Sequence, residues 1–516
     1  MQRFIAKSIA GLLVAGVLPG AHAFSMIGPF PAWQTQEIGY PIAAELGGPM
    51  NIGEEYRHNL PLLTYGFDES FLTYFGAQGV EAIEKVFAYL NGLGDYAQMS
   101  DQDLASWPLD TRRFNHQASA LSLFDLRSYA LGLMVEQLGL APAERYTWTL
   151  RSRVVINDIP IYSVIKRNFD PLTRTPSPYV NGTLYTYEIL QTYADPDIWE
   201  AVEIAVDPTR PAGSSVSSFG TDGGTLLAPG AYLSFTPGVF FTGLTRDDIG
   251  GLRHLYNPGL FHVENPPTNV VRAPLTATEE NVILTEETGG NPWGPPSGGT
   301  NATVTNLVAP VLAAVRAGVG KLSFARVDYD SLIGAWTPVT NRYVDRFVTN
   351  GIASTQVLDR VLPAPDFLFA AADLGIDAVG LPIFATRTLA FSNNDGINGI
   401  AGNDGPGTIA QGNVVTFSKL GQSLLNINGG GEVDAQQVVW WGTYDGTTNE
   451  PVVYPVGTSI RQVEQIISSG LVTEGPNPWL PPPYLLLGGG AQPTNLPAAG
   501  GVIAGGVAVG GGTTTP

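Results

Sequence analysis

The clearest hydrophobic pattern in the chain lies at residues 126–141, L-R-S-Y-A-L-G-L-M-V-E-Q-L-G-L-A. Apolar side chains recur there three and four positions apart, which is the spacing of one face of an α-helix. This face consists of Leu126, Tyr129, Ala130, Leu133, Met134 and Leu138. Ser122, with Asp125 three positions on, is placed to cap the start of the helix. Gly139 and Pro142 are placed to end it. The pattern therefore predicts a helix that packs into the core as scaffold.

Other elements are predicted on either side of this helix. Residues 59–67, N-L-P-L-L-T-Y-G-F, predict a strand, and a long helix follows it. The apolar face of that helix consists of Val80, Ile83, Val86, Phe87 and Leu90. Residues 244–256, L-T-R-D-D-I-G-G-L-R-H-L-Y, predict a further helix. Thr245 would cap it, and Asp247 and Asp248 would lie in its first turn, where the helix dipole favours negative charge.

The pattern changes in the second half of the chain. Residues 258–303 are rich in proline and predict a linker or strap. Beyond them apolar and polar positions alternate, which predicts strands. These strands are at 321–327, 339–348, 386–391, 413–419 and 437–444, with short helices at 310–317 and 460–467. We therefore expect a β-rich, sandwich-like domain at 304–475. Residues 476–516 carry no charge and become rich in Pro, Gly and Ala, which predicts a low-complexity tail.

The helix at 126–141 resembles the active-site helix of the matrixins, a branch of the metzincin zinc metalloproteases. In that family the motif H-E-x-x-H-x-x-G-x-x-H supplies three zinc-binding histidines and a general-base glutamate. The strand at 59–67 and the helix after it resemble the first strand and first helix of matrixin domains. Residues 244–256 resemble the closing helix of the family. The resemblance covers residues 37–257 and implies a matrixin-like α+β domain at 24–257.

The residues at the family's functional positions do not carry its chemistry. Aligned on Gly139, the ligand positions fall on Gly132, Glu136 and Pro142, and the base position falls on Leu133. Glycine and proline have no group that binds zinc, and leucine cannot accept a proton. We therefore interpret the helix as a degenerate, non-zinc-binding active-site helix, and we predict no catalytic residue and no cofactor.

The remaining candidates for zinc ligands are scattered along the sequence. The chain has no cysteine, and no two of its five histidines are four residues apart, the spacing that puts two ligands on one helical face. A site assembled from the distant His58, His116 and His254 stays open as an alternative. The sequence predicts no metal site beyond that.

The first 23 residues predict a secretory signal peptide. Arg3 and Lys7 form a short basic start, residues 9–17 are apolar, and Ala21-His22-Ala23 fits a cleavage site. The apolar run is too short to span a bilayer. We therefore expect a secreted, extracellular or cell-surface protein that is cleaved after Ala23, with no integral membrane segment in the mature chain.

Charge limits the classes of partner. The chain has 26 basic and 46 acidic residues, a formal net charge of −20. Nucleic acids and anionic membrane surfaces are bound through basic surfaces, so this balance argues against both. Only 14% of the residues are charged, with 62 Gly and 40 Pro, which is typical of a β-rich extracellular protein with many loops.

A short aromatic-proline motif occurs twice. The core N-P-W-x-P-P is found at 291–296 and at 477–482. Proline on both sides of a tryptophan favours an extended polyproline II conformation, which would present Trp293 and Trp479 as rigid anchors. Each tryptophan either holds its own segment onto the chain or docks into a neighbouring subunit. The sequence leaves both possibilities open.

Two features offer an alternative in the β-rich segment. Asp328 and Asp330 would lie on one face of a strand, as a solvated pair or as a carboxylate pair for glycoside hydrolysis. Trp440, Trp441 and Tyr444 either pack in the core or stack on sugars. Taken together, the sequence predicts a secreted, non-catalytic structural, adhesive or assembly protein that binds protein partners or itself. The alternatives are a carboxylate-based extracellular hydrolase, possibly glycan-directed, and a residual metallopeptidase with an atypical site.

Overall fold

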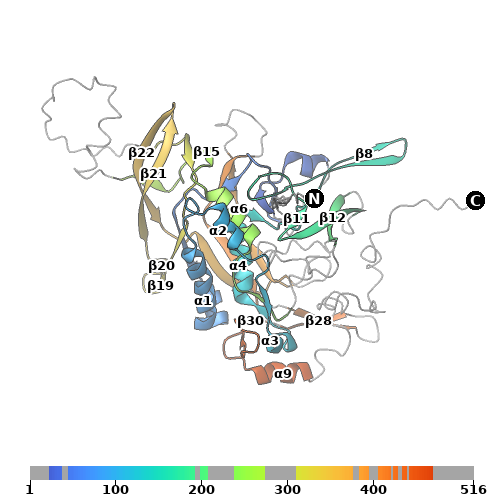
Figure 1. Cartoon of the computed structure of the whole chain (residues 1–516). Coiled ribbons are helices and arrows are strands. Elements are labelled where there is room, and N and C mark those ends of the chain that lie inside the picture. Colours follow the sequence, from blue (N-terminus) through green and yellow to red (C-terminus); the bar gives the residue numbers. More distant parts are fainter. Residues whose placement is uncertain are drawn as a thin grey trace, which may run out of the picture.

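Figure 1 shows the computed structural model of the chain, a mixed α+β fold in which strands predominate. It describes residues 23–37, 45–191, 198–206, 237–273, 309–375, 383–393, 405–419, 422–427, 433–438 and 441–468. Strands account for 39% and helices for 21%, which confirms the predicted α+β class with a strand-rich composition. Across the described segments, no helix combines enough length with enough apolar character to cross a membrane.

A five-stranded sheet organises the core. Its order is β18 (Ser323–Arg326), β4 (Leu62–Phe67), β23 (Phe367–Ala372), β27 (Asn413–Ser418) and β24 (Ala385–Arg387). The first four strands are parallel, and β24 is antiparallel to β27. Most side chains of β4, β23 and β27 are buried, as expected for parallel strands that are covered on both faces.

This sheet joins segments that the sequence assigns to two different domains. β4 belongs to the predicted domain 24–257, whereas its neighbours β18 and β23 belong to the predicted domain 304–475. One hydrophobic core contains buried side chains from Phe24 to Val463. The predicted linker therefore does not separate the two segments in the packing. The prediction of an irregular strap is wrong for its described part, because β15 (Phe261–Glu264) and β16 (Val270–Arg272) lie within it and pair with strands of the second half of the chain. Parallel strands pair across long sequence separations, and local patterning does not reveal such pairs.

Three helices cover the core where the sequence predicts them. α1 (Glu69–Gly92) is capped by Asp68 and buries the predicted apolar face. Gly76 interrupts it with a φ of 61°, a conformation that favours glycine. α6 (Arg246–Tyr256) begins with a capping box between Thr245 and Asp248. α4 (Leu126–Gln137) lies beside α1. The remaining helices are η1 (Trp33–Glu37), α2 (Asp101–Ser106), α3 (His116–Ala120) and α9 (Ile460–Ser468).

The helix predicted at 310–317 is wrong. Residues 314–317 form strand β17 (Ala314–Ala317) of a second five-stranded sheet, which is antiparallel throughout. Its order is β15 (Phe261–Glu264), β17, β21 (Val339–Thr349), β22 (Ile352–Leu362) and β16 (Val270–Arg272). Burial alternates along β17, and the buried Arg316 contacts Asp345 on β21. Pairing on both sides thus decides the conformation of this short segment.

Small sheets and hairpins complete the described structure. β1 (Phe24–Gly28) pairs with β2 (Gly48–Pro49), β7 (Leu140–Ala141) and β10 (Asn168–Phe169). The other groups are β3 (Tyr56–Arg57), β26 (Gly407–Ile409) and β25 (Phe391–Asn393); β5 (Arg112–Phe114) and β14 (Val239–Phe241); β6 (Phe124–Asp125), β30 (Trp441–Thr443) and β31 (Val452–Val453); β8 (Thr149–Ile156) and β9 (Ile159–Ile165); β11 (Tyr179–Val180), β12 (Thr183–Gln191) and β13 (Trp199–Ala205); β19 (Tyr329–Asp330) and β20 (Ala335–Trp336); β28 (Gln422–Ile427) and β29 (Val433–Val438).

Several sequence predictions fall outside the described residues. These are the signal peptide up to residue 22, most of the strap, both tryptophans of the repeated motif (Trp293 and Trp479), Trp440 and the tail at 476–516. Phe24, the predicted first residue of the mature chain, is described and begins β1.

Candidate functional site

Helix α4 begins at Leu126, three residues later than a cap at Ser122 would place its start. Phe124 and Asp125 form β6, which pairs in parallel with β30, so the backbone stays extended up to Asp125. Asp125 is the N-cap, and its carboxylate accepts a hydrogen bond from the backbone N–H of Ser128 at 2.9 Å. Ser122 lies earlier, with a φ of 55°. The prediction of Ser122 as the cap is wrong because a strand pair between distant segments holds this entry extended.

The positions on α4 that the resemblance aligns with the family's active site lie in the core. Gly132 is buried and Leu133 has no exposed surface. Every residue of α4 except Arg127 is buried, so the helix is enclosed on all sides rather than on one face. α1, β7, β14 and β30 pack around it. The predicted burial of this helix is confirmed. The sequence predicted that one apolar face is buried, and the structure buries the other faces as well.

Gly139, the residue that anchors the family resemblance, has a structural reason to be glycine. Its φ is 102°, in the left-handed region that ends helices and that glycine adopts without strain. A Cβ at this position would lie 2.7 Å from the backbone oxygen of Tyr56. The turn and the close backbone contact together explain this residue without any reference to catalysis.

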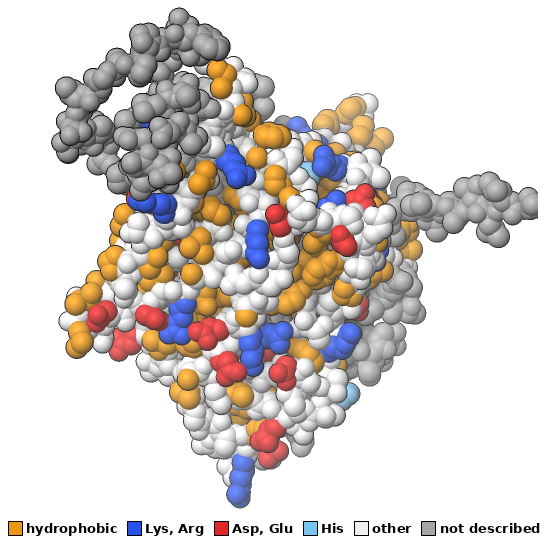
Figure 2. Space-filling model, turned by 60° about the vertical axis from the view of Figure 1, so that its left-hand side comes forward, with side chains coloured by type: hydrophobic (Ala, Val, Ile, Leu, Met, Phe, Trp, Pro, Cys, Tyr) orange, Lys and Arg blue, Asp and Glu red, His pale blue; other side chains and the backbone are white. Residues whose placement is uncertain are grey.

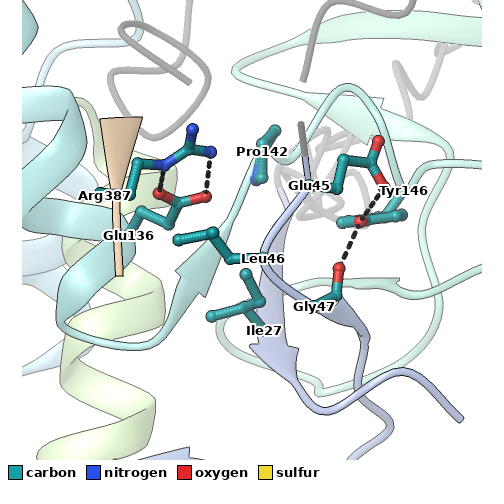
Figure 3. Close-up of a pocket in the computed structure, with 8 residues that line it drawn as sticks. All are labelled: Ile27, Glu45, Leu46, Gly47, Glu136, Pro142, Tyr146 and Arg387. Carbon is teal, nitrogen blue, oxygen red and sulfur yellow. Dashed lines mark hydrogen bonds and ion pairs between the residues drawn. The ribbon is translucent and has the colours of Figure 1, made fainter. Parts of the chain in front are cut away.

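Glu136, which the matrixin resemblance aligns with a zinc-ligand position, is held by an arginine from the central sheet. Both carboxylate oxygens contact the guanidinium of Arg387 on β24: Oε2 accepts from Nε, and Oε1 accepts from Nη2 at 2.9 Å (Figure 3). The two side chains are only 2–3% exposed. A bidentate, buried pair of this kind orients both groups firmly. Glu136 therefore joins α4 to β24, an arrangement that gives it a structural role.

A small cavity adjoins this ion pair. It is lined by Ile27, Glu45, Leu46, Gly47, Glu136, Pro142, Tyr146 and Arg387. The Tyr146 hydroxyl, whose pKa burial raises, contacts Glu45 and donates to the Gly47 carbonyl at 3.2 Å (Figure 3). The cavity volume is about 10 Å³, which corresponds to one water molecule. This space does not admit a sugar ring or a peptide segment.

Several carboxylates gather around Arg145. Its guanidinium contacts Glu45 at 3.1 Å and Glu200 at 3.3 Å. On the same strand as Glu200, Glu203 is buried, and burial raises its pKa to about 8 despite the nearby arginine. The cavity beside Glu200 and Trp199 also measures about 10 Å³. Glu203 does not line this cavity, and with its raised pKa it is mostly protonated at neutral pH.

The histidines considered as a dispersed zinc site lie in separate surroundings. His58 contacts the Gln137 carbonyl at 2.9 Å, and burial lowers its pKa to about 4. His116 is exposed at the start of α3. His254 contacts Glu55 at 3.0 Å. In the described part of the chain, no group of three or more His, Cys, Asp or Glu side chains is arranged to hold a metal ion.

Sequence reasoning missed a buried charge cluster between β3, α6 and β15. Glu55 contacts His254 and also lies 3.2 Å from His262, whose other ring nitrogen lies 3.6 Å from Glu264. Arg57 donates to Glu264 at 2.9 Å. Burial alone would raise the pKa of Glu55, but the two imidazoles outweigh it and hold that pKa well below the usual range. Alternating charged residues, Glu55 with Arg57 and His262 with Glu264, were the local signals of this cluster.

The groups of the hydrolase alternative are placed differently from a catalytic pair. Asp328 is exposed and pairs with Arg326 at 2.7 Å, while Asp330 accepts hydrogen bonds from the turn that follows it. Trp441 and Tyr444 are 1% exposed, so their predicted packing in the core is confirmed. The Trp441 indole donates to the Ser418 carbonyl at 2.6 Å.

A candidate interaction surface lies at the β8–β9 hairpin, which projects from the body of the molecule (Figure 1). Its tip exposes a set of aliphatic side chains, from 49% at Val155 to 65% at Ile159. The set consists of Val154, Val155, Ile156, Ile159 and Ile161, and we call it the aliphatic tip. The turn residues Asn157 and Asp158 have φ values of 53° and 63°, as in the tight two-residue turn of a rigid hairpin.

Tryptophans fix the base of this hairpin. The guanidinium of Arg151 lies 4.9 Å from the ring of Trp33, and that of Arg153 lies 4.7 Å from Trp199. The Lys166 amine lies 4.9 Å from the ring of Trp148. These cation–π contacts hold basic side chains beside the strands. The hairpin is therefore an ordered arm with a basic base and an aliphatic tip.

Comparisons of the chain with protein-family models, with curated proteins and with solved structures gave no match.

Proposed function

We propose that the mature chain is a secreted, non-catalytic structural, adhesive or assembly protein with a matrixin-like segment whose active-site helix has become scaffold. The observation that carries the proposal is the aliphatic tip of the β8–β9 hairpin. Contiguous exposed aliphatic side chains on an ordered arm are characteristic of an interaction site. We propose, as part of the same interpretation, that residues 304–475 have a sandwich-like arrangement and that residues 24–257 are matrixin-like.

The former active-site positions support the same interpretation. Glu136 forms an ion pair with Arg387, and Leu133 packs in the core. Each side chain therefore contributes to the fold in a way that does not involve a substrate. Releasing Glu136 for chemistry would break its buried ion pair with Arg387, which costs about 3–5 kcal/mol by comparison with other buried pairs. This position therefore serves stability better than catalysis.

The test is self-association of the mature chain, measured by light scattering at increasing concentration together with capture of partners from the native extract. Ile156→Ser/Ile159→Ser in the aliphatic tip should reduce association or partner capture at an unchanged melting temperature, by about 2 kcal/mol or thirtyfold in affinity. The double variant Trp293→Ala/Trp479→Ala separately tests the two anchors that the sequence predicts. Phe114→Ala, a change at an exposed aromatic side chain elsewhere, is the matched control.

A monomeric wild type that binds nothing, with tryptophan variants that merely unfold, would contradict the proposal. The competing hydrolase has its own readout. Turnover of a glycan or peptide that Glu203→Gln abolishes, or one tightly held zinc per chain in elemental analysis, would favour an enzyme instead.

A further inference from the structure

We propose that the β8–β9 hairpin docks onto the β19–β20 turn of a second copy of this chain, so that copies associate head to tail. The inference rests on the proposed assembly function and names the partner and both contact surfaces. It is carried by exposed aliphatic side chains on two projections, by the opposite charges of the hairpin and of the rest of the chain, and by the positions of the two surfaces on the molecule.

The hairpin differs in charge from the rest of the chain. Residues 149–167 contain four basic residues and one acidic residue, Asp158, and so carry a formal charge of +3. Since the whole chain carries −20, the remainder carries −20 − 3 = −23. A basic arm on an acidic body is electrostatically complementary to another copy of that body. The same acidic body would be repelled by an anionic membrane, and Asp158 lies at the point of the arm that would have to enter the lipid first.

The β19–β20 turn exposes two aliphatic side chains on the body of the molecule. Leu332 is 95% exposed and Ile333 is 65% exposed. Asp330 fixes their presentation, because its carboxylate accepts a hydrogen bond from the Leu332 N–H at 2.8 Å and its carbonyl accepts from the Gly334 N–H. Asp328 lies next to this turn with an exposed side chain that pairs with Arg326, and Arg326 also contacts Glu84. We call Leu332 and Ile333 the turn knob.

The two surfaces lie on opposite sides of the molecule. In Figure 1 the hairpin projects at the upper right, and β19 and β20 lie at the lower left. The hairpin of one copy therefore cannot reach the turn knob of the same copy, and the contact requires a second molecule. Figure 2, which brings the left side of Figure 1 forward, shows acidic, basic and hydrophobic side chains interspersed on this face. A contact between two different surfaces leaves one of each free, so the assembly extends unless it closes into a ring.

The contact is made by side chains rather than by strand addition. Pro160 lies opposite Val155 in the hairpin and has no N–H to offer a third strand along β9. The aliphatic tip therefore packs against Leu332 and Ile333, while Arg151, Arg153 and Lys166 lie nearer the acidic residues of the partner copy. Burying these side chains supplies the affinity, and the charges set the orientation.

The test uses two variants of the mature chain that each remove one half of the contact. The tip variant is Ile156→Ser/Ile159→Ser, and the knob variant is Leu332→Ser/Ile333→Ser. All four positions are exposed, so both variants should fold with the melting temperature of wild type. The matched control is Leu72→Ser/Val361→Ser, which changes two exposed aliphatic side chains on other surfaces.

Sedimentation velocity between about 1 and 100 µM gives the readout. Wild type and control should form oligomers that grow with concentration and dissociate as salt rises from about 0.05 to 0.5 M. Each variant alone should be monomeric, with association weakened at least thirtyfold, roughly the loss of one strong anchor. An equal mixture of the two variants should form dimers and nothing larger, because one intact tip meets one intact knob.

Three results would overturn the inference. Oligomers that persist in both variants would place the interface elsewhere and leave the proposed assembly function standing. A mixture that stays monomeric would show that the tip and the knob do not meet. A monomeric wild type that floats with phosphatidylcholine–phosphatidylglycerol vesicles, and loses this binding in the tip variant, would identify a lipid surface as the occupant.

Discussion

At the scale of single residues, the buried cluster around Glu55 shows how charges are kept inside this protein. His262 lies between Glu55 and Glu264, and Arg57 balances Glu264 on its other side. Burial disfavours the charged imidazole, yet the carboxylates on both sides raise the pKa of His262 above its ordinary value. A protonated His262 places a positive charge between the two carboxylates, whereas a neutral ring places none there.

This arrangement predicts a loss of stability with rising pH. Because the pKa of His262 is higher in the folded than in the unfolded chain, its contribution is complete below about pH 6.5 and disappears as pH rises through the folded pKa. The free energy of unfolding, measured by denaturant titration at several pH values, should therefore fall above about pH 6.5 less steeply in His262→Gln than in wild type.

Two features make this comparison specific. Glu203, with a pKa raised to about 8, also destabilises the folded state as pH rises, but it does so equally in both proteins. His116→Gln, a change at an exposed histidine, should leave the pH profile of wild type unchanged. Parallel profiles for His262→Gln and wild type would mean that His262 is neutral in the folded chain.

At the scale of elements, the contact between Glu136 and Arg387 connects a helix with the edge of the central sheet. α4 presents Glu136 in its last turn, and β24 presents Arg387 at its last residue. The side chains are separated by 251 positions in sequence. The helix is thereby fixed to a strand that only the fold brings near, in addition to its apolar packing.

Breaking this pair from one side should be costly. Arg387→Ala leaves a buried carboxylate without its counter-charge and is expected to lower the free energy of unfolding by about 3–5 kcal/mol. The double variant Arg387→Met/Glu136→Leu removes both charges and should recover most of that loss. Arg342→Ala breaks a similar pair with Asp359 whose arginine is half exposed, and it should cost about 1 kcal/mol or less. Equal losses in Arg387→Ala and Arg342→Ala would contradict a structural role for the buried pair.

At the scale of the whole molecule, the central sheet joins the two halves of the chain. β4 lies between β18 and β23, so its two hydrogen-bonding edges are satisfied by strands from beyond residue 309. Phe67 and Phe71 pack against Phe369, and Phe417 lies against Phe71. The predicted domain at 24–257 therefore lacks, by itself, both neighbours of its main strand and part of its core.

This dependence predicts that residues 24–257 do not fold alone. The fragment should show no cooperative thermal transition by circular dichroism, because unpaired strand edges and uncovered aromatic side chains remain exposed to water. The mature chain should melt with the main loss of structure in one transition. A fragment that melts cooperatively near the temperature of the mature chain would show that the first half has a sufficient core of its own.

The sequence by itself determined the elements whose signals are local. The apolar face of α1, the Thr245 cap of α6, the strands at 62–67 and 339–349 and the helix at 460–468 follow from periodicity and from capping residues. Such signals lie within a few residues of each other, and backbone hydrogen bonding in a helix or the alternation of a strand requires no distant partner.

Only the tertiary structure decided which segments meet. In the structure β18 and β23 lie beside β4, and residues 314–317 form a strand instead of the predicted helix. The cap of α4 is Asp125 instead of Ser122, and Glu136 pairs with Arg387. Each of these outcomes depends on hydrogen bonds or ion pairs between residues that lie far apart in sequence. A local pattern shows that a side chain is apolar or charged, but not which distant partner satisfies it, because that choice minimises the free energy of the whole packed chain.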